Sequence, residues 1–261
     1  MYIRFLTLVL TVFNSGLCFS QPIEAVNFKK YSGACLSSTK FFNPGTFTFD
    51  VKASKMEGTI FCAFLTDFEI NRSEDKLKHL ELGFELIGKR IDTIKCVAYL
   101  YGGKRLTKSF PLGFDASVKY HNYKIVQEDN AVKWLVDGKV FYQLDTEPSL
   151  VLLKPMRLYL NFRPAVSHCD WVYGCIRRAK LPTYAFVKNF EYSPNFNITA
   201  RENFPYATFT KNYKDNFRRF NAEIWQYSTI DLIKGNKPVY LTENLVFTRK
   251  YLKMIINRDE D

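Results

Sequence analysis

Short strand-like runs, separated by turn signals, recur about every dozen residues along this chain and leave no room for long helices. Val136-Asp-Gly-Lys139 lies between two alternating runs, which predicts a tight β-hairpin. We find no amphipathic helical period and no long internal repeat. The pattern predicts an all-β chain folded as an antiparallel two-sheet β-sandwich. The runs expected to form strands are Thr46–Val51, Gly58–Leu65, Leu80–Leu86, Thr93–Tyr101, Tyr123–Gln127, Ala131–Val136, Lys139–Leu144, Met156–Phe162 and Ala185–Tyr192.

One of these runs carries two glutamates on the same face. In Leu80-Glu-Leu-Gly-Phe-Glu-Leu-Ile-Gly88, apolar residues alternate with Glu81 and Glu85. At about 3.3 Å per residue, the Cα atoms of the two glutamates lie about 13 Å apart. If both side chains lean inward, their carboxyl groups approach the separation of about 5–5.5 Å that a retaining glycosidase uses. The alternative is an ordinary strand whose charged face is only solvated.

The first 20 residues have the pattern of a secretory signal peptide. Arg4 is followed by a short apolar run, and small residues precede Gln21 at a plausible cleavage site. The run is too short for a membrane span, and no later segment reaches the length that a span needs. We therefore expect an exported protein in which residues 21–261 form one domain. Asn71 and Asn197 are N-glycosylation acceptors if the host glycosylates exported proteins.

The charge and the aromatic content narrow the choice of partners. The formal net charge is +11, but the lysines and arginines are spread along the chain and no nucleic-acid motif accompanies them. The 24 phenylalanines and 16 tyrosines favour strands and offer surfaces on which sugars stack. We expect a polysaccharide partner, no nucleic acid and a monomer.

The cysteines argue against a metal centre. Cleavage of the leader would leave an odd number, Cys35, Cys62, Cys96, Cys169 and Cys175, so one thiol is left over in any disulfide pairing. Cys169 and Cys175 are close enough in sequence to close a small loop, although the sequence does not fix the pairs. No Cys-x-x-Cys spacing occurs, and the three histidines lack ligand partners. The sequence predicts no metal and no cofactor.

An ordered set of landmarks resembles glycoside hydrolase family 16, in particular its lichenase-type β-glucanases. Tyr31-Ser-Gly followed by Gly45–Ala53 resembles two early strands of the family, and Glu81–Gly88 is similar to its catalytic strand. Leu112–Ala116, Tyr120–Tyr123, Val132–Gly138, Pro155–Asn161 and Pro182–Tyr192 follow in the family's usual order. The resemblance covers residues 28–192 and implies a concanavalin A-like jelly roll.

The C-terminal part resembles a family segment that normally comes first. Residues 215–256, including Asp215–Tyr227 and Glu243–Thr248, are similar to the family's N-terminal segment, and residues 193–214 form a polar connector. A circular permutation explains this order, because domain termini often lie close together and tolerate rejoining. The alternative is an unrelated C-terminal extension.

The resemblance also implies a site. It gives Glu81 the role of nucleophile and Glu85 that of general acid/base, with Glu85 protonated near neutral pH. Tyr99, Asn161 and Trp171 match sugar-contacting positions, Tyr99 being equally suited to ordinary packing. Trp134, Trp225 and His121 are expected to be structural. Calcium sites are common in the family, but this sequence shows no ligand cluster.

Two departures from the family pattern affect the site. Gly83 replaces the middle aspartate that hydrogen-bonds the nucleophile, and His79-Leu80 replaces a Trp-Asp pair. We therefore expect slow turnover, which Gly83→Asp should raise. Arg163 stands where the family has a tryptophan after Asn161.

The sequence leaves three functions open. The first is a secreted glycosidase or transglycosidase acting on internal β-glucan linkages. The second is a non-catalytic, lectin-like β-glucan-binding protein derived from such an enzyme, and the third is a cell-wall or coat protein that uses the sandwich as a scaffold. Retention of both Glu81 and Glu85 favours the first function, and loss of the residue between them favours the second.

Overall fold

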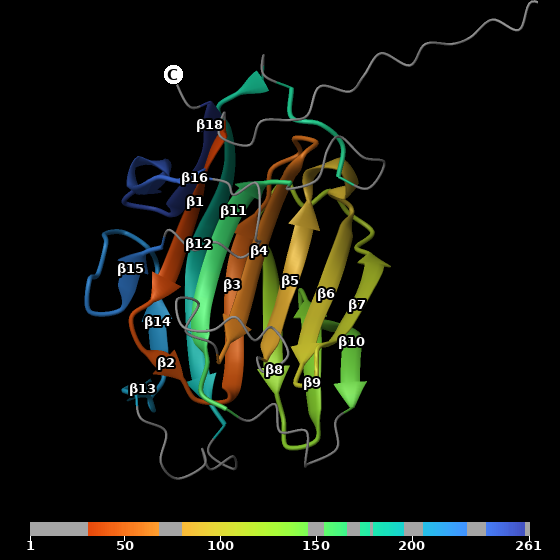
Figure 1. Cartoon of the computed structure of the whole chain (residues 1–261), viewed down its shortest axis with the longest axis vertical. Coiled ribbons are helices and arrows are strands. Elements are labelled where there is room, and N and C mark those ends of the chain that lie inside the picture. Colours follow the sequence, from red (N-terminus) through yellow and green to blue (C-terminus); the bar gives the residue numbers. More distant parts are fainter. Residues whose placement is uncertain are drawn as a thin grey trace, which may run out of the picture.

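A computed structural model describes residues 31–67, 80–145, 154–165, 173–177, 180–195, 206–228 and 239–258. Regular structure in these residues consists of strands and short 3₁₀ turns (Figure 1). The predicted all-β fold is confirmed. The strands are β1 (Tyr31–Ser38), β2 (Phe41–Phe42), β3 (Gly45–Lys52), β4 (Thr59–Thr66), β5 (Glu81–Ile87), β6 (Thr93–Leu100), β7 (Lys104–Pro111), β8 (His121–Gln127), β9 (Ala131–Val136), β10 (Lys139–Asp145), β11 (Arg157–Pro164), β12 (Thr183–Pro194), β13 (Thr208–Phe209), β14 (Tyr213–Asp215), β15 (Trp225–Tyr227), β16 (Val239–Tyr240), β17 (Leu245–Phe247) and β18 (Leu252–Arg258).

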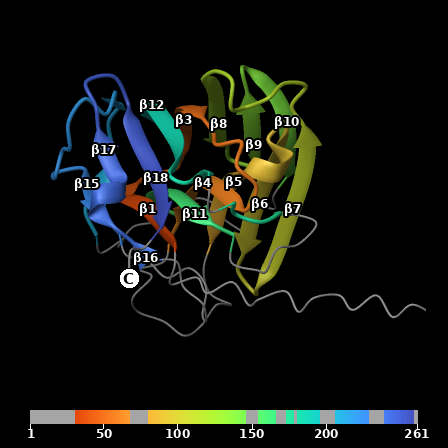
Figure 2. The same cartoon turned by 90° about the horizontal axis from the view of Figure 1, so that it is seen from above.

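The strands form two facing layers that are joined at one side. The hydrogen-bonded order is β10-β9-β8-β3-β12-β18-β1-β11-β4-β5-β6-β7. Figure 2 shows β3, β8 and β9 in one layer and β4, β5 and β6 in the other. At the far edges, the rings of Phe110 and Tyr142 lie 5.7 Å apart. The result is a nearly closed sandwich.

The core between the layers follows from the alternation in the sequence. In β3, Phe47, Phe49 and Val51 are fully buried, while the residues between them are partly exposed. The Phe49 ring lies 5.9 Å from that of Phe84 on β5 in the opposite layer. Burial of such large aromatic side chains supplies most of the driving force that holds the layers together.

Every predicted run is a strand, but β7 is not among the predicted runs. Its sequence, Lys-Arg-Leu-Thr-Lys-Ser-Phe-Pro, is mostly exposed and carries three cations. As the last strand of its layer, β7 pairs on one side only, with β6. Charged side chains protect such an edge from pairing with other chains, and they also remove the apolar alternation that would have predicted the strand.

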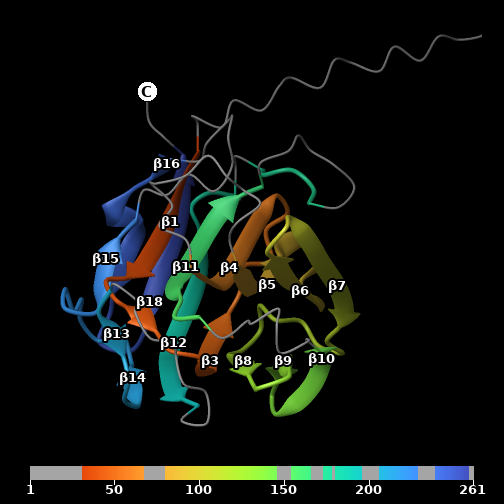
Figure 3. The same cartoon turned by 60° about the horizontal axis from the view of Figure 1, so that its bottom comes forward.

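The C-terminal strands belong to the sandwich. β18 pairs with β12 on one side and with β1 on the other, β15 and β16 pair with β1, and β14 pairs with β12. Figure 3 shows β13, β14 and β15 gathered on the side of the molecule where β1 and β12 lie. Trp225 is 1% exposed and donates a hydrogen bond to Asp215 Oδ2 at 2.7 Å. β14 to β18 thus complete the sheet around β1 and β12.

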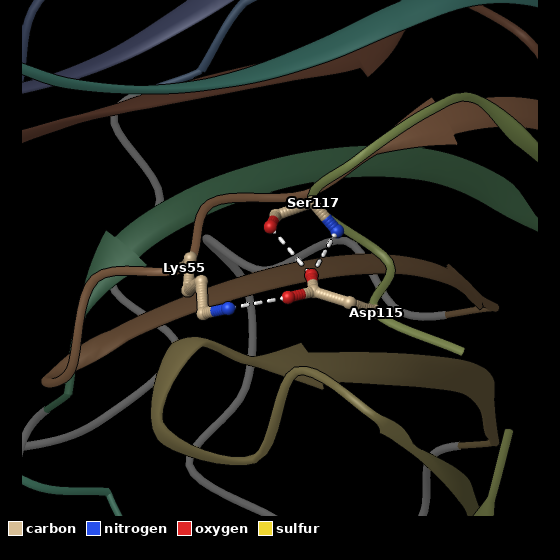
Figure 4. Close-up of polar contacts among 3 residues, drawn as sticks. All are labelled: Lys55, Asp115 and Ser117. Carbon is tan, nitrogen blue, oxygen red and sulfur yellow. Dashed lines mark hydrogen bonds and ion pairs between the residues drawn. The ribbon is translucent and has the colours of Figure 1, made fainter. Parts of the chain in front are cut away.

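A charged contact fixes the loop between β7 and β8 (Figure 4). Lys55 Nζ lies 2.6 Å from Asp115 Oδ2, and the backbone and hydroxyl of Ser117 both donate to Asp115 Oδ1. The Lys55 ammonium, followed by Ser117, lowers the pKa of Asp115 to about 2. The contact joins the chain after β3 to the chain before β8.

None of the helices in the described ranges is long and apolar enough to cross a membrane.

Candidate active site

The two glutamates of β5 lie on the same face of their strand. Leu82, Phe84 and Leu86 point into the core, so Glu81, Gly83 and Glu85 point to the opposite face of the layer. We call this the carboxylate face and define it by the residues of β11, β4, β5, β6 and β7 that share the orientation of Glu81. Strand register places these residues in rows that run from β11 to β7. One row is Asn161, Cys62, Glu85, Lys95 and Ser109, the next is Tyr159, Phe64, Gly83, Val97 and Thr107, and the third is Arg157, Thr66, Glu81, Tyr99 and Arg105.

Glu85 is held in an ion pair. Lys95 is its direct cross-strand partner on β6, and Lys95 Nζ lies 2.7 Å from Glu85 Oε2. The side chains of Lys95 and Glu85 are only 15% and 14% exposed. Directly opposed charges of opposite sign stabilise a strand pair, and partial burial reduces screening by salt.

The pKa of Glu81 is raised. Burial, followed by the negative charge of Glu85, raises the pKa of Glu81 from 4.5 to about 7, although Arg105 and Arg163 act in the opposite direction. In the free protein Glu81 is therefore mostly protonated below about pH 7. The family resemblance implies a proton on Glu85 instead, and the ion pair with Lys95 would have to open before Glu85 could take up that role.

The raised pKa predicts a pH-dependent stability. Folded Glu81 binds its proton more tightly than the unfolded chain does, so its contribution is complete below pH 4.5 and is lost as the pH rises toward 7. Glu81→Gln stays neutral and should unfold at a temperature at least about 2 °C above wild type at pH 8, with the two proteins alike at pH 4.5. Thermal unfolding followed by circular dichroism from pH 4 to 8 measures this. Parallel profiles for the two proteins would contradict the assignment.

Gly83 lies where two strands approach closely. A Cβ atom added to Gly83 would lie 2.7 Å from Phe64 Cβ and 2.8 Å from the backbone oxygen of Ala63. The carbonyl oxygen of Gly83 accepts a hydrogen bond from Trp134 Nε1 at 2.8 Å, which ties β5 to β9 in the other layer. The place of the family's middle aspartate is thus next to Phe64, whose ring stacks on Tyr159 at 5.0 Å.

This close approach changes what Gly83→Asp is expected to do. Gly83→Ala and Gly83→Asp both add the same Cβ, so each should lower the free energy of unfolding by about 1–3 kcal/mol because the strands must move apart. Urea unfolding of the two variants against wild type tests this. Equal losses in both variants would assign the effect to the Cβ, whereas a stable and faster Gly83→Asp enzyme would restore the expectation drawn from the sequence.

The predicted sugar-contacting residues have different surroundings. Tyr99 is the cross-strand partner of Glu81, and the guanidinium carbon of Arg105 lies 5.1 Å from its ring centre. Asn161 is fully buried, and its Nδ2 donates to Tyr240 Oη at 2.8 Å. Tyr99 therefore lies at the pair of glutamates, and Asn161 lies in the row of Glu85. Trp171 is outside the described residues, as are Asn71, Asn197 and residues 1–20.

The residues expected to be structural are packed as such. Trp134 is fully buried, and Trp225 lies in the core as described above. His121 is 4% exposed, stacks on Phe114 with ring centres 3.6 Å apart, and has Nδ1 2.6 Å from Asp137 Oδ2. None of the three belongs to the strands that make up the carboxylate face.

Sequence reasoning missed the cations of the carboxylate face. Lys95 and Arg105 are on β6 and β7, and only the strand register brings them beside Glu85 and Tyr99. The charge alternation of Thr93-Ile-Lys-Cys-Val was a usable signal, because Lys95 there occupies an outward position like those of the glutamates. If the run that holds Glu85 and the run that holds Lys95 are paired as a hairpin, the two side chains can be placed opposite each other.

The described residues include Cys35, Cys62, Cys96 and Cys175. Cys175 is disulfide-bonded, and Cys35, Cys62 and Cys96 are free and buried. Burial raises the pKa of Cys35 to about 12, so this thiol stays protonated. The described part of the chain contains no cluster of three or more His, Cys, Asp or Glu that could hold a metal ion.

Known proteins share both the fold and parts of the sequence. A β-glucanase of Brevibacillus brevis is 24% identical over 177 residues, which cover 67% of this chain and 66% of the relative. A xylanase/β-glucanase of Ruminococcus flavefaciens is 25% identical over 143 residues, which cover 55% of this chain but only 17% of that longer protein. The chain therefore spans less than two thirds of either relative.

Solved structures match the described architecture. The β-glucanase of Bacillus licheniformis superimposes with a TM-score of 0.54 at 22% identity and covers 61% of this chain and 70% of that chain. An apo Crh5 transglycosylase gives a TM-score of 0.51 at 19% identity, with 64% and 70% covered. At these identities the matches establish the fold alone.

A family model decides the membership. The model of glycosyl hydrolases family 16 matches residues 13–171, which are more than half of the chain. The matched range includes β5 with both glutamates and the strands on either side of it. This protein belongs to glycosyl hydrolases family 16.

Proposed function

We propose that this protein is a secreted glycosidase or transglycosidase that acts on internal β-glucan linkages by a retaining mechanism, with Glu81 and Glu85 as its two carboxylates. The observation that carries the proposal is the pair itself. Both side chains lie largely buried on one face of one strand, and burial followed by the charge of Glu85 raises the pKa of Glu81. Membership of family 16 supports it, as does the word β-glucanase in the names of the two relatives described above.

The proposed reaction uses one proton and two carboxylates. The Glu81 carboxylate attacks the anomeric carbon while Glu85 protonates the leaving glycosidic oxygen, which gives a glycosyl-enzyme. Glu85 then takes a proton from water, or from an acceptor sugar hydroxyl, whose oxygen displaces Glu81. In the free protein Glu81 is mostly protonated below about pH 7, so it must lose this proton before it can attack. Glu85 must leave its ion pair with Lys95 before it can serve as the acid.

Trapping experiments distinguish the two carboxylates. A 2-deoxy-2-fluoro β-glucosyl donor with an activated leaving group forms a long-lived ester with the nucleophile of a retaining glycosidase. Digestion and mass spectrometry should locate this ester on Glu81. An ester on Glu85 would reverse the two roles, in agreement with the protonation of the free protein, and would leave the retaining mechanism intact.

Three further residues are proposed to contact the sugar. Tyr99 is beside Glu81 and offers an aromatic ring, while Asn161 shares the row of Glu85. Trp171 is included on the resemblance alone. Stacking of sugars on aromatic rings and hydrogen bonds to amides are the usual means by which a polysaccharide chain is oriented.

The order of the segments and the export of the protein are also proposals. We infer that residues 215–256 correspond to the N-terminal segment of related enzymes, so that the domain 21–261 is circularly permuted. The pairing of β18 with both β12 and β1 supports this, because these strands fill positions beside the start of the domain. We further propose that residues 1–20 direct export and that the protein acts outside the cell.

A product assay tests the function. Purified protein is incubated with lichenan, laminarin, chitin and xyloglucan, and the products are sized by chromatography. Hydrolysis gives shorter chains from one of the β-glucans, and transglycosylation gives both shorter and longer chains. If wild type and Glu81→Gln are equally inert on every substrate yet both bind, the protein is a lectin-like binding module. That second function is favoured by Gly83, which removes the aspartate of the family pattern, and by the Lys95 ion pair, which engages the carboxylate of Glu85.

A further inference from the structure

Arg163 on β11 is a buried cation on the carboxylate face without a matching anion among the described residues. Only 9% of Arg163 is exposed, and its Nε has no hydrogen-bond partner in the described ranges. Its Nη1 makes a long contact of 3.4 Å with the carbonyl oxygen of Pro164. A guanidinium has five N–H donors, so most of its capacity is unused.

The carboxylates in its neighbourhood are otherwise engaged. Glu85, which interacts electrostatically with Arg163, is in the 2.7 Å ion pair with Lys95. Glu81 is protonated up to about pH 7. No described carboxylate forms an ion pair with Arg163. Together with Lys95, Arg105 and Arg157, this residue brings four positive charges to a face with two glutamates. Burying an unpaired charge is costly, which makes such a residue a candidate for binding an anion.

Tyr240 adds a hydrogen-bond donor next to this cation. A Cβ atom added to Gly33 would lie 3.3 Å from Arg163 Cα and 3.3 Å from Tyr240 Cε1, so the Arg163 backbone and the Tyr240 ring flank the same glycine. The Arg163 charge also interacts electrostatically with Tyr240. Tyr240 Oη accepts a hydrogen bond from Asn161, which leaves its own hydrogen to donate. Burial raises the pKa of Tyr240, so this hydrogen is retained at any ordinary pH.

We infer that Arg163 and Tyr240 form a subsite for an anionic substituent, a carboxylate or a sulfate ester, on the glycan that this protein binds. The inference rests on the proposed function, because the subsite lies on the same face as the two glutamates, and it narrows the substrate class to acidic β-linked glycans. A guanidinium binds a carboxylate or a sulfate through two parallel N–H donors, and the partial burial of Arg163 makes this pairing stronger than on an open surface.

Matched polysaccharides test the inference. Lichenan and laminarin are each compared with their carboxymethylated and sulfated derivatives by isothermal titration calorimetry at roughly physiological ionic strength. Wild type should bind at least one derivative about 10-fold more tightly than its neutral parent, and the two arms identify the favoured anion. Arg163→Gln should reduce this preference to about 2-fold or less, with binding of the neutral parent unchanged within about 2-fold.

A matched control separates the subsite from general attraction. Arg218 is an exposed cation after β14, and Arg218→Gln removes one charge from the same basic protein. It should keep the full preference of wild type. Equal losses in Arg163→Gln and Arg218→Gln, or a wild-type protein without any preference, would overturn the inference. If the wild type cleaves neutral lichenan but shows no preference for the anionic derivatives, this inference is overturned and the proposed function stays in place.

The stability of the variants gives a second readout. Removing a buried and unpaired charge should not destabilise the fold, so Arg163→Met should unfold at the wild-type temperature or above it. A fall of more than about 5 °C would show that Arg163 is a structural residue and would also overturn the inference.

Discussion

Glu81→Gln and Glu85→Gln are each expected to lower β-glucan turnover at least about 100-fold while leaving glucan binding largely intact. Glutamine keeps the shape of each side chain but can neither attack an anomeric carbon nor carry a proton to the leaving oxygen. The rate is measured as the release of reducing ends, and binding is measured separately by calorimetry. A variant that keeps more than a tenth of wild-type turnover would remove its residue from the proposed mechanism.

A control glutamate exists on the opposite layer. Glu128 forms a 2.7 Å ion pair with Lys133, as Glu85 does with Lys95, but its side chain is 43% exposed and lies far from β5 in the sheet order. Glu128→Gln should retain wild-type turnover. Comparing it with Glu85→Gln separates loss of a catalytic carboxylate from loss of a glutamate–lysine pair.

Truncation after Asn203 is expected to unfold the protein. It removes β13 to β18, including the strand β18 that joins β12 to β1. Both of these strands would then expose unpaired backbone groups and the core side chains that β18 covers. Loss of the far-ultraviolet strand signal and rapid proteolysis are the measurements. A truncated protein that unfolds as cooperatively as the full chain would contradict the role assigned to β14 to β18.

A single substitution tests the contribution of the C-terminal strands to stability without removing them. Trp225 packs against Phe190 with ring centres 5.7 Å apart, and it is almost fully buried. Trp225→Ala should cost about 3–5 kcal/mol in free energy of unfolding, because it leaves a large cavity and removes the indole donor of Asp215. Tyr227, two residues later on β15, is 41% exposed, and Tyr227→Ala should cost less than about 1 kcal/mol.

The sequence alone is enough to predict the core strands and to predict that Glu81 and Glu85 share a face. β3, β5 and β9 alternate between apolar and polar residues, so their boundaries could be predicted within one or two residues. Glu81 and Glu85 share a face because the side-chain period of a strand is two. These features depend only on neighbours in the chain, which a single sequence displays directly.

Features that depend on pairing between distant strands could not be predicted in this way. The closeness of Gly83 to Phe64 is set by how β4 and β5 approach, and the partner of Glu85 is set by the register of β6. The raised pKa of Glu81 comes from burial and from the nearby charge of Glu85, and neither can be read from one strand alone. Edge strand β7 has no apolar alternation to reveal it.

The place of β18 in the sheet has a consequence for how the molecule is made. Tyr31 on β1 pairs with Arg258 on β18, so the first and the last described strands are neighbours. During synthesis, β1 and β12 therefore cannot pair with β18 until residues up to 258 have left the ribosome. Contacts between such distant parts of a chain form slowly, and exposed strand edges attract other chains meanwhile. The sandwich therefore closes late, and the edges of β1 and β12 stay open until β18 has been made.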